Sequence, residues 1–187
     1  MPEAVAGLVL AAGSGLRFGM PKALARTGDG TPWITVACEA LRGGGCGPVV
    51  VSLGDLAECA LHLVPADVDP VVVRDHGTGL SASLRAGLLA LTTTSAEVVV
   101  VTLVDLPEQS PDAVVRVLGA RPGTATLRRA TFDGRVGHPV VIGRDHWDPL
   151  LGHLAGDAGA RSYLAARGAT GVDCTDLGGG RDVDVAS

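Results

Sequence analysis

Short apolar runs alternate with amphipathic segments through the first two thirds of this chain. The apolar runs are rich in Val and Leu, and they predict strands at residues 5–11, 48–53, 70–74 and 97–104. Segments with helical spacing of their apolar residues predict helices at residues 33–41, 55–63, 81–91 and 111–118. Strands that alternate with helices are typical of a parallel sheet, and uninterrupted apolar strands are usually covered on both faces. We therefore expect an α/β fold, a Rossmann-like three-layer α/β/α sandwich with a mostly parallel sheet.

The last third of the chain has a different pattern. Two strand-like segments, residues 125–132 and 137–142, flank the turn signal Asp133-Gly134, and they predict a hairpin or a bent ribbon over the site. Two helices and a short strand are expected to follow, at residues 144–154, 162–167 and 170–174. Because no clear linker or internal repeat interrupts the chain, we expect residues 1–187 to form a single domain, with Gly178-Gly179-Gly180 as a flexible turn.

A glycine-rich loop follows the first predicted strand, in the stretch LVLAAGSGLRFGMPKAL of residues 8–24. Glycines let the backbone approach a ligand closely, and the flanking cations Arg17 and Lys22 suit a polyphosphate. The stretch is not a Walker A loop, because its lysine is preceded by proline and followed by alanine. It is not a dinucleotide fingerprint either, because Gly19 comes one residue too late. It is therefore a third kind of phosphate loop, or else a surface turn without a ligand.

Three segments with ligand-binding character come at the carboxyl ends of predicted strands. They are the loop at Gly13, the loop at 77–79 and Asp105. Ligands of open α/β sheets bind beyond these ends, so we expect the three segments to converge on one site. Asp105 is a candidate ligand for Mg²⁺ on phosphate oxygens, or simply a cap of the turn that follows it. Asp182 and Asp184 share a face if the tail is extended, and either would supply a second carboxylate.

Composition and charge argue against several function classes. The net charge is -5 and no run of Lys and Arg appears, so we expect no nucleic-acid binding. The amino-terminal apolar run is too short to span a bilayer and lacks the basic start of a signal peptide. We therefore expect a cytoplasmic protein with no membrane partner. The four cysteines form no C-x-x-C pair, and we expect them to be reduced and mostly buried.

Other catalytic patterns are missing or ambiguous. The sequence contains neither a G-x-S-x-G elbow nor an H-E-x-x-H motif, which argues against serine-hydrolase and zinc-protease chemistry. His138, in the segment GHP, fits a structural turn as well as a functional role. Thr78 or Ser81 would serve either as the N-cap of the helix that follows or in ligand binding. Trp33 and Trp147 are expected to be packing residues.

The loop closely resembles the motif L-A-A-G-x-G-x-R-x-G-x-P-K-x-L of the MobA-like NTP transferase family. Three further segments are similar to its molybdenum-cofactor cytidylyltransferase branch, namely HGTGLSASLRAGL, VTLVDLP, and GHPVVIG followed by GDAGARSYL. The resemblance covers nearly the whole chain, in the right order. It implies a fold like that of nucleotide-diphospho-sugar transferases. It also implies transfer of a nucleoside monophosphate from an NTP to a phosphate on an acceptor, with release of pyrophosphate.

The resemblance also implies roles for individual residues. Lys22 and Arg17 would neutralise the triphosphate, and Asp105 would hold Mg²⁺, so that all three are catalytic. The second metal ligand would be Asp184, with Asp182 as the alternative, because the tail DVDVAS departs from the D-I-D-T-P-E-D of the family. The segment around His138 would face the acceptor. The residues implied in nucleotide binding are Ala11, Ala12, Gly13, Ser14, Gly15, Arg17, Lys22, Gly79 and Ser83.

The resemblance favours CTP over GTP modestly, because the guanylyl branch has L-A-G-G where this chain has LAAG at residues 10–13. The implied acceptor is molybdopterin, and a molybdoenzyme would be a further partner. Two alternatives stay open. One is a nucleotidyltransferase of the same fold for another acceptor, such as a sugar phosphate. The other is a nucleotide-binding accessory protein for molybdoenzyme maturation, although the presence of Arg17, Lys22 and Asp105 together favours catalysis.

Overall fold

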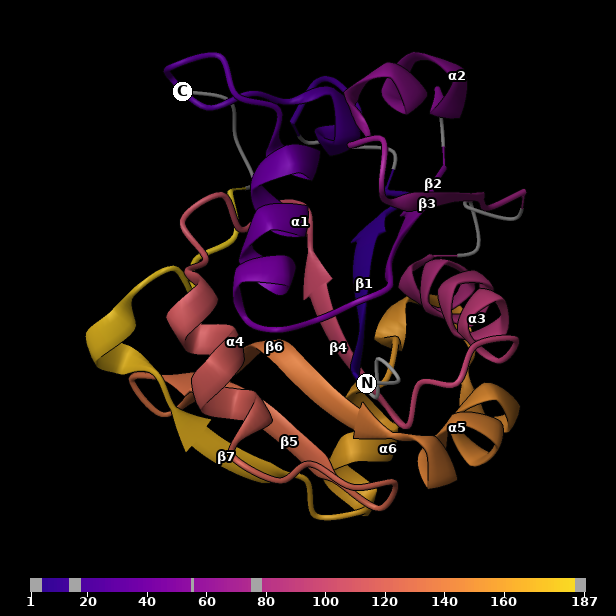
Figure 1. Ribbon diagram of the computed structural model, residues 1–187, viewed down its shortest axis with the longest axis vertical. Helices are drawn as coiled ribbons and strands as arrows, with labels where there is room; N and C mark the ends of the chain where they lie inside the picture. Colours follow the sequence, from indigo (N-terminus) through magenta and orange to yellow (C-terminus); the bar gives the residue numbers. More distant parts are fainter. Residues whose placement is uncertain (1–4, 14–17, 55, 75–78, 184–187) are drawn as a thin grey trace.

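The computed structural model describes residues 5–13, 18–54, 56–74 and 79–183, which contain a seven-stranded mixed sheet (Figure 1). Its strands are β1 (Val5–Ala11), β2 (Val49–Leu53), β3 (Asp69–Val72), β4 (Val98–Leu103), β5 (Leu127–Phe132), β6 (Arg135–Gly143) and β7 (Thr170–Asp173). The α-helices are α1 (Trp33–Gly43), α2 (Ala57–Ala60), α3 (Leu80–Leu91), α4 (Pro111–Leu118), α5 (Trp147–His153) and α6 (Arg161–Ala166). Short 3₁₀ helices are η1 (Lys22–Leu24), η2 (Leu61–Leu63), η4 (Arg144–His146), η5 (Gly156–Ala158) and η6 (Thr175–Leu177).

The order of the strands in the sheet is β3-β2-β1-β4-β6-β5-β7. β1 pairs in parallel with β2 and β4, and β2 pairs in parallel with β3, as the alternation of strands and helices predicts. β6 runs antiparallel to both of its neighbours, β4 and β5, whereas β7 is parallel to β5. The start of β6 therefore lies at the same edge of the sheet as the ends of β1, β4 and β5.

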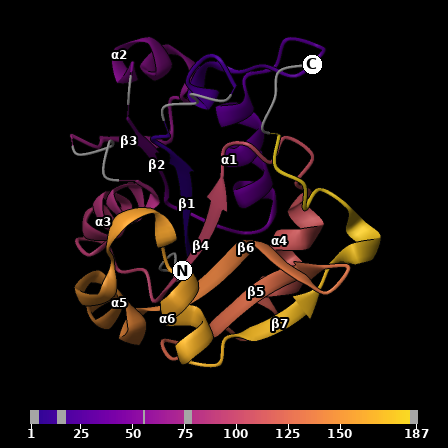
Figure 2. The same cartoon turned by 180° about the vertical axis from the view of Figure 1, so that it is seen from behind.

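Two hydrophobic cores lie on the two faces of the sheet. Alternate residues of each central strand supply them, because successive side chains of a strand point to opposite faces. Val9 joins one core, whereas Leu8 and Leu10 join the other. The helices α1 and α4 cover the first face, and α3, α5 and α6 cover the second (Figures 1 and 2). The expected three-layer α/β/α sandwich with a mostly parallel sheet is confirmed.

The strands and helices expected from the sequence are present, with small shifts at their ends. The segment 55–63 divides into α2 and η2, and Pro32 is the N-cap of α1. β3 is less buried than its apolar sequence suggests, because it lies at the edge of the sheet and Val72 is largely exposed.

Other expectations from composition can also be compared with the structure. Cys38, Cys46 and Cys174 are buried free thiols, and burial raises the pKa of Cys38 and Cys46 to about 12. Trp33 and Trp147 are buried packing residues, as expected. Within the described part of the chain, no helix combines the length and the apolar character that crossing a membrane would require.

β5 and β6 form the expected hairpin, but it does not fold over the site as a ribbon. Residues 98–101 of β4 pair with residues 140–143 of β6, so the hairpin extends the sheet. Arg129 of β5 pairs with Val140 and Thr131 pairs with Val136, which leaves three residues of β6 opposite one of β5. Such a bulge bends a strand and redirects its side chains, and this one contains His138.

The glycine-rich tail, expected as a flexible turn, packs closely against the body of the protein. A Cβ atom on Gly179 would lie 2.4 Å from a backbone carbonyl oxygen of the loop after β4, and one on Gly180 would lie 2.3 Å from the ring of Phe132. Only residues without a side chain can follow this path. The path brings Val183 to Asp105, whose carbonyl oxygen accepts a hydrogen bond of 3.0 Å from the Val183 N–H.

Candidate functional site

Lys22 and Asp105 meet at the carboxyl edge of the sheet. Pro21 precedes η1, and its carbonyl oxygen accepts a hydrogen bond of 2.9 Å from the N–H of Leu24, while Ala23 is buried against the core. This tight turn positions Lys22, whose Nζ lies 2.7 Å from Oδ2 of Asp105. The two side chains are 16% and 17% exposed, so the ion pair lies at the rim of the core rather than in open solvent.

Asp105 follows β4 at a point where the backbone is well fixed. The N–H of Val104 donates a hydrogen bond of 3.1 Å to the carbonyl oxygen of Leu10, which extends the pairing of β4 with β1. Below the loop, the buried hydroxyl of Thr102 donates to the side-chain oxygen of Gln109. Oδ1 of Asp105 is buried and has no hydrogen-bond partner among the described residues. A buried carboxylate oxygen of this kind is suited to a ligand, because leaving it unpaired is unfavourable.

The expected phosphate loop lies only partly within the described residues. Ala11 ends β1, and Ala11 and Ala12 are buried, whereas Gly13 is exposed beyond the strand. After the loop, the ring of Phe18 packs against Trp33 with 5.3 Å between the ring centroids. The candidates that lie outside the described residues are Ser14, Gly15, Arg17 and Asp184, as well as Thr78.

Gly79 is the N-cap of α3, and its backbone has a φ of +93°. A Cβ atom here would lie 1.8 Å from Oδ1 of Asp157, so only glycine allows η5 to pack against the start of α3. Gly79 and the segment GDAGAR of residues 156–161, far apart in the sequence, are thus neighbours in space. Of the two residues considered as the N-cap, Ser81 is not the cap, because Ser81 and Ser83 lie inside α3 and are buried.

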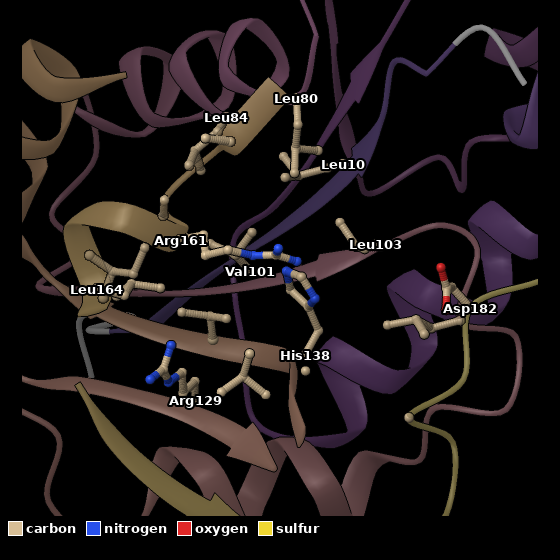
Figure 3. A pocket seen from close by; sticks show the side chains of 18 of the residues that line it. Leu10, Leu80, Leu84, Val101, Leu103, Arg129, His138, Arg161, Leu164 and Asp182 are labelled. Carbon is tan, nitrogen blue, oxygen red and sulfur yellow. The ribbon is translucent and has the colours of Figure 1, made fainter. Parts of the chain in front are cut away.

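A cavity of about 420 Å³ opens near the end of β4, on the face of the sheet covered by α3 and α6 (Figure 3). Leu103 and Leu106, which flank Asp105 along the chain, belong to its lining. Most of the remaining lining is aliphatic. The polar side chains that line the cavity are Arg129, His138, Asp157, Arg161 and Asp182. An apolar cavity with a few polar groups is typical of small-molecule sites.

The floor of the cavity follows from the register of the sheet. Val101 of β4 pairs with Val140 of β6, and Val140 pairs with Arg129 of β5. Residues that pair across strands point to the same face, and all three of these side chains line the cavity. The bulge in β6 comes next along this edge, and it places His138 in the cavity.

His138 and Arg161 lie next to each other in the cavity (Figure 3). The pKa of His138 is lowered to about 4, mainly by burial and also by the Arg161 guanidinium, while the Asp182 carboxylate opposes the shift. His138 is therefore neutral near pH 7, where it can donate one hydrogen bond and accept another. By contrast, His146 and His153 make contacts within the helical layer that contains α5 and α6.

The described residues offer few side chains that could hold a metal ion. Among the described residues, no group of three or more His, Cys, Asp or Glu side chains gathers in a way that could hold a metal ion. Asp105 is at the site, and Asp182 lines the adjacent cavity. A cation that binds together with substrate phosphates needs only one or two protein carboxylates. The unpartnered Oδ1 of Asp105 fits this role.

Two arginines of the cavity, Arg129 and Arg161, are not indicated as site residues by the sequence patterns. Arg161 lies in the segment GDAGARSYL, whose resemblance to the family does not by itself mark this residue. The sequence gives one weak indication for Arg129. It lies two residues after Leu127 in the same strand, so both side chains are on the same face of that strand. Leu127 packs in the core on that face.

Known proteins are similar to this chain in sequence over nearly its whole length. The family model for the MobA-like NTP transferase domain matches residues 7–171. The chain is 35% identical to nicotine blue oxidoreductase from Paenarthrobacter nicotinovorans over 192 aligned positions, which cover 96% of this chain and 92% of that protein.

Solved structures are also similar. Rv0371c from Mycobacterium tuberculosis H37Rv aligns with a TM-score of 0.80 and 28% identity, covering 99% of this chain and 95% of that chain. The structure of Rv0371c in complex with manganese aligns with a TM-score of 0.72 and 26% identity, over 91% and 86% of the two chains. A nucleotidyl transferase from Methanothermobacter thermautotroptrophicus shares the fold, with a TM-score of 0.79 and 22% identity over 97% and 92%. Because the family model spans the sequence from within β1 to β7, and so includes Lys22, Asp105 and most of the cavity, the chain belongs to the MobA-like NTP transferase family.

Proposed function

We propose that this protein transfers CMP from CTP to a phosphate-bearing acceptor, molybdopterin or a related molecule, and releases pyrophosphate. Membership of the MobA-like family makes it a nucleotidyltransferase, and our proposal concerns the nucleotide and the acceptor. The observation that carries the proposal is the pairing of Lys22 with Asp105 at 2.7 Å, beside a cavity large enough for a small molecule.

The proposed reaction needs no activated serine or cysteine, because the acceptor phosphate is itself a nucleophile. One of its oxygens attacks the α-phosphorus of the nucleotide, and a new P–O bond forms. The bond to pyrophosphate breaks at the same centre, and pyrophosphate leaves with the electron pair. The site must hold two anions together and stabilise negative charge on the leaving group.

The residues at the carboxyl edge of the sheet suit these requirements. Lys22 supplies fixed positive charge, and we assign a second cation to Arg17. Backbone N–H groups of residues 11–15 would bind phosphate oxygens, as glycine-rich loops do elsewhere. We place Gly79 and Ser83 near the base and the ribose, and the segment around His138 near the acceptor.

A divalent cation, which we take to be Mg²⁺, would be held by Asp105 and Asp184, with Asp182 as the alternative second ligand. The unpartnered Oδ1 of Asp105 supports this assignment, and so does the manganese complex of the relative Rv0371c. When bound, such a cation neutralises charge on phosphate oxygens. Lys22 balances the charge on the other oxygen of the Asp105 carboxylate.

A pyrophosphate-release assay across the four NTPs tests the proposal, with molybdopterin and a sugar phosphate as the acceptors. We expect release with CTP and molybdopterin together, and little release when either is omitted. Release with the sugar phosphate instead would favour the alternative acceptor class. Nucleotide binding without release from any combination would overturn catalysis and favour the accessory role in molybdoenzyme maturation.

The name of one relative, nicotine blue oxidoreductase, makes a second chemistry worth testing in parallel. The mainly aliphatic cavity near the end of β4 is the observation that favours it, because such a cavity also suits an uncharged aromatic molecule. Consumption of NADH or NADPH in the presence of a quinone-like dye would support this second function. Pyrophosphate release without any such consumption would exclude it.

A further inference from the structure

Arg129 is one of the polar groups of the cavity for which the proposed chemistry has no role. It lies in β5, paired with Val140, and its side chain lines the cavity on the same side as Leu164 (Figure 3). Asp182, beside the reaction edge, lies on the opposite side of the cavity in this view. Arg129 is therefore remote from the end of the cavity where transfer is proposed.

The neighbouring arginine shows what a structural role in this strand looks like. Arg128 points to the other face of the sheet, where its guanidinium donates a hydrogen bond of 2.6 Å to the carbonyl oxygen of Leu118 in α4. Nε of Arg129, by contrast, is buried and has no hydrogen-bond partner among the described residues. A buried donor on a charged group is costly to leave unpaired, so a binding partner for this group is expected.

The carboxylates that line the cavity lie away from Arg129. The carboxylate of Asp157 lies at the start of α3, against Gly79, and Asp182 lies beside the reaction edge. Aliphatic side chains, including Val140 and Leu164, line the part of the cavity around Arg129. A molecule that fills this space needs an apolar middle and, at its far end, a group that satisfies a guanidinium. A guanidinium pairs best with planar anions such as carboxylates, or with phosphates.

We infer that Arg129 selects acceptors that carry a second anionic group, separated from the reacting phosphate by an apolar stem. This inference rests on the proposed function, because it takes the reacting phosphate to lie at the Lys22–Asp105 edge. The second group forms charge-assisted hydrogen bonds with Arg129 and leaves the chemistry unchanged. Arg129 is thus a specificity-determining residue for the acceptor.

Binding of two matched series of compounds tests the inference. The first is a set of ω-phosphoalkanoates of increasing chain length, and the second is the n-alkyl phosphates of the same lengths. Their dissociation constants are measured by calorimetry in the presence of a non-hydrolysable CTP analogue. We expect the carboxylate to improve affinity by about tenfold or more at the best-fitting length, the scale of a hydrogen bond to a charged group.

Substitution of Arg129 assigns the effect to one residue. In Arg129→Met the advantage of the carboxylate series should disappear, while the alkyl phosphates bind as before, and Arg129→Lys should restore part of it. Arg128→Met, which removes the same charge from the opposite face of β5, should keep the full advantage. Melting temperatures confirm that each variant is folded.

Three results would overturn the inference. They are equal affinity of the two series for the wild-type protein at every length, an advantage that survives in Arg129→Met, and a lack of binding by both series. Pyrophosphate release is measured separately on the same proteins. Absence of the preference in the wild-type protein, with pyrophosphate release intact, overturns the inference alone. A clear preference without release from any nucleotide overturns the transfer reaction and leaves Arg129 as an anion-binding residue.

Discussion

Nζ of Lys22 lies 2.7 Å from Oδ2 of Asp105, although 83 positions separate the two residues in the chain. The pair joins the turn that follows the glycine-rich loop to the loop that follows β4. Each side chain compensates the charge of the other at the rim of the core. Substitution of Lys22 or Asp105 leaves the other charge partly buried and without that partner. The stability of each variant should therefore be measured together with its activity.

We expect Lys22→Ala to lower turnover by about 10²-fold or more, the scale seen when one preorganised charge-stabilising group is lost. The measurement is pyrophosphate release at saturating CTP. Arg26→Ala serves as a control, because it removes a nearby exposed cation that donates a hydrogen bond to the carbonyl oxygen of Gly30. Turnover like that of the wild type in Lys22→Ala would remove Lys22 from the catalytic group.

The meeting of Lys22 and Asp105 could be predicted in outline from the sequence. Apolar strands alternating with helices fix a parallel sheet, and both residues follow strands of that sheet at their carboxyl ends. The direct ion pair could not be predicted, because it depends on how η1 turns after Pro21.

The acceptor side of the site was harder to predict. Whether the hairpin of β5 and β6 covers the sheet or extends it depends on the free edge of β4, which no local pattern reveals. Once the hairpin joins the sheet, the register of β5 decides which of Arg128 and Arg129 enters the cavity. The glycines of the tail predict a flexible turn when only the sequence is considered. The atoms that they pack against, such as the ring of Phe132, are distant in the sequence and give no local pattern.

We expect Asp105→Asn to abolish the response of activity to added Mg²⁺, because the amide removes the negative charge that would hold the cation. A Mg²⁺ titration of pyrophosphate release measures this response. Asp112→Asn, in the exposed first turn of α4, is a control for loss of a carboxylate elsewhere on the protein. If Asp105→Asn titrated with Mg²⁺ as the wild type does, the carboxylate would not be a metal ligand.

His138 should make stability depend on pH in a defined window. Its pKa is lowered to about 4 in the folded protein, mainly by burial, against about 6.5 for the ordinary side chain. Between these values the unfolded chain binds more protons, so the free energy of unfolding falls as pH decreases from about 6.5 towards about 4. The fall amounts to at most about 1.4 kcal/mol per pH unit for one group.

Urea unfolding near pH 7 and near pH 5 measures this effect, and His138→Gln removes the titrating group while keeping its polarity. The variant should lose less stability on acidification than the wild type does, because all other groups are shared. His62→Gln, at an exposed position, controls for the substitution itself. Equal losses in the wild type and in His138→Gln would contradict the prediction.

Gly180→Ala should detach the tail from Asp105. The added Cβ would lie 2.3 Å from the ring of Phe132, so the chain must move, at a cost of about 1–3 kcal/mol. The hydrogen bond from the Val183 N–H to the Asp105 carbonyl should then be lost, and the exchange of that amide hydrogen should accelerate. Gly123→Ala, where a Cβ meets nothing within 4 Å, should leave the exchange unchanged. Slow exchange at Val183 in Gly180→Ala would show that the tail tolerates the extra atom.

Lys22 is also the only lysine in the 187-residue sequence, since all other members of its 15 Lys and Arg residues are arginines. An amine-selective reagent can therefore modify one side chain of this protein, and that side chain is the one paired with Asp105. A mass shift located at Lys22, distinguished from that of the α-amino group, therefore reports on binding at the proposed phosphate site. We expect CTP to protect Lys22 from the reagent, and Asp105→Asn to increase its reactivity in the absence of nucleotide. The nucleotide preference of the protein can thus be ranked by chemical footprinting before any acceptor is known.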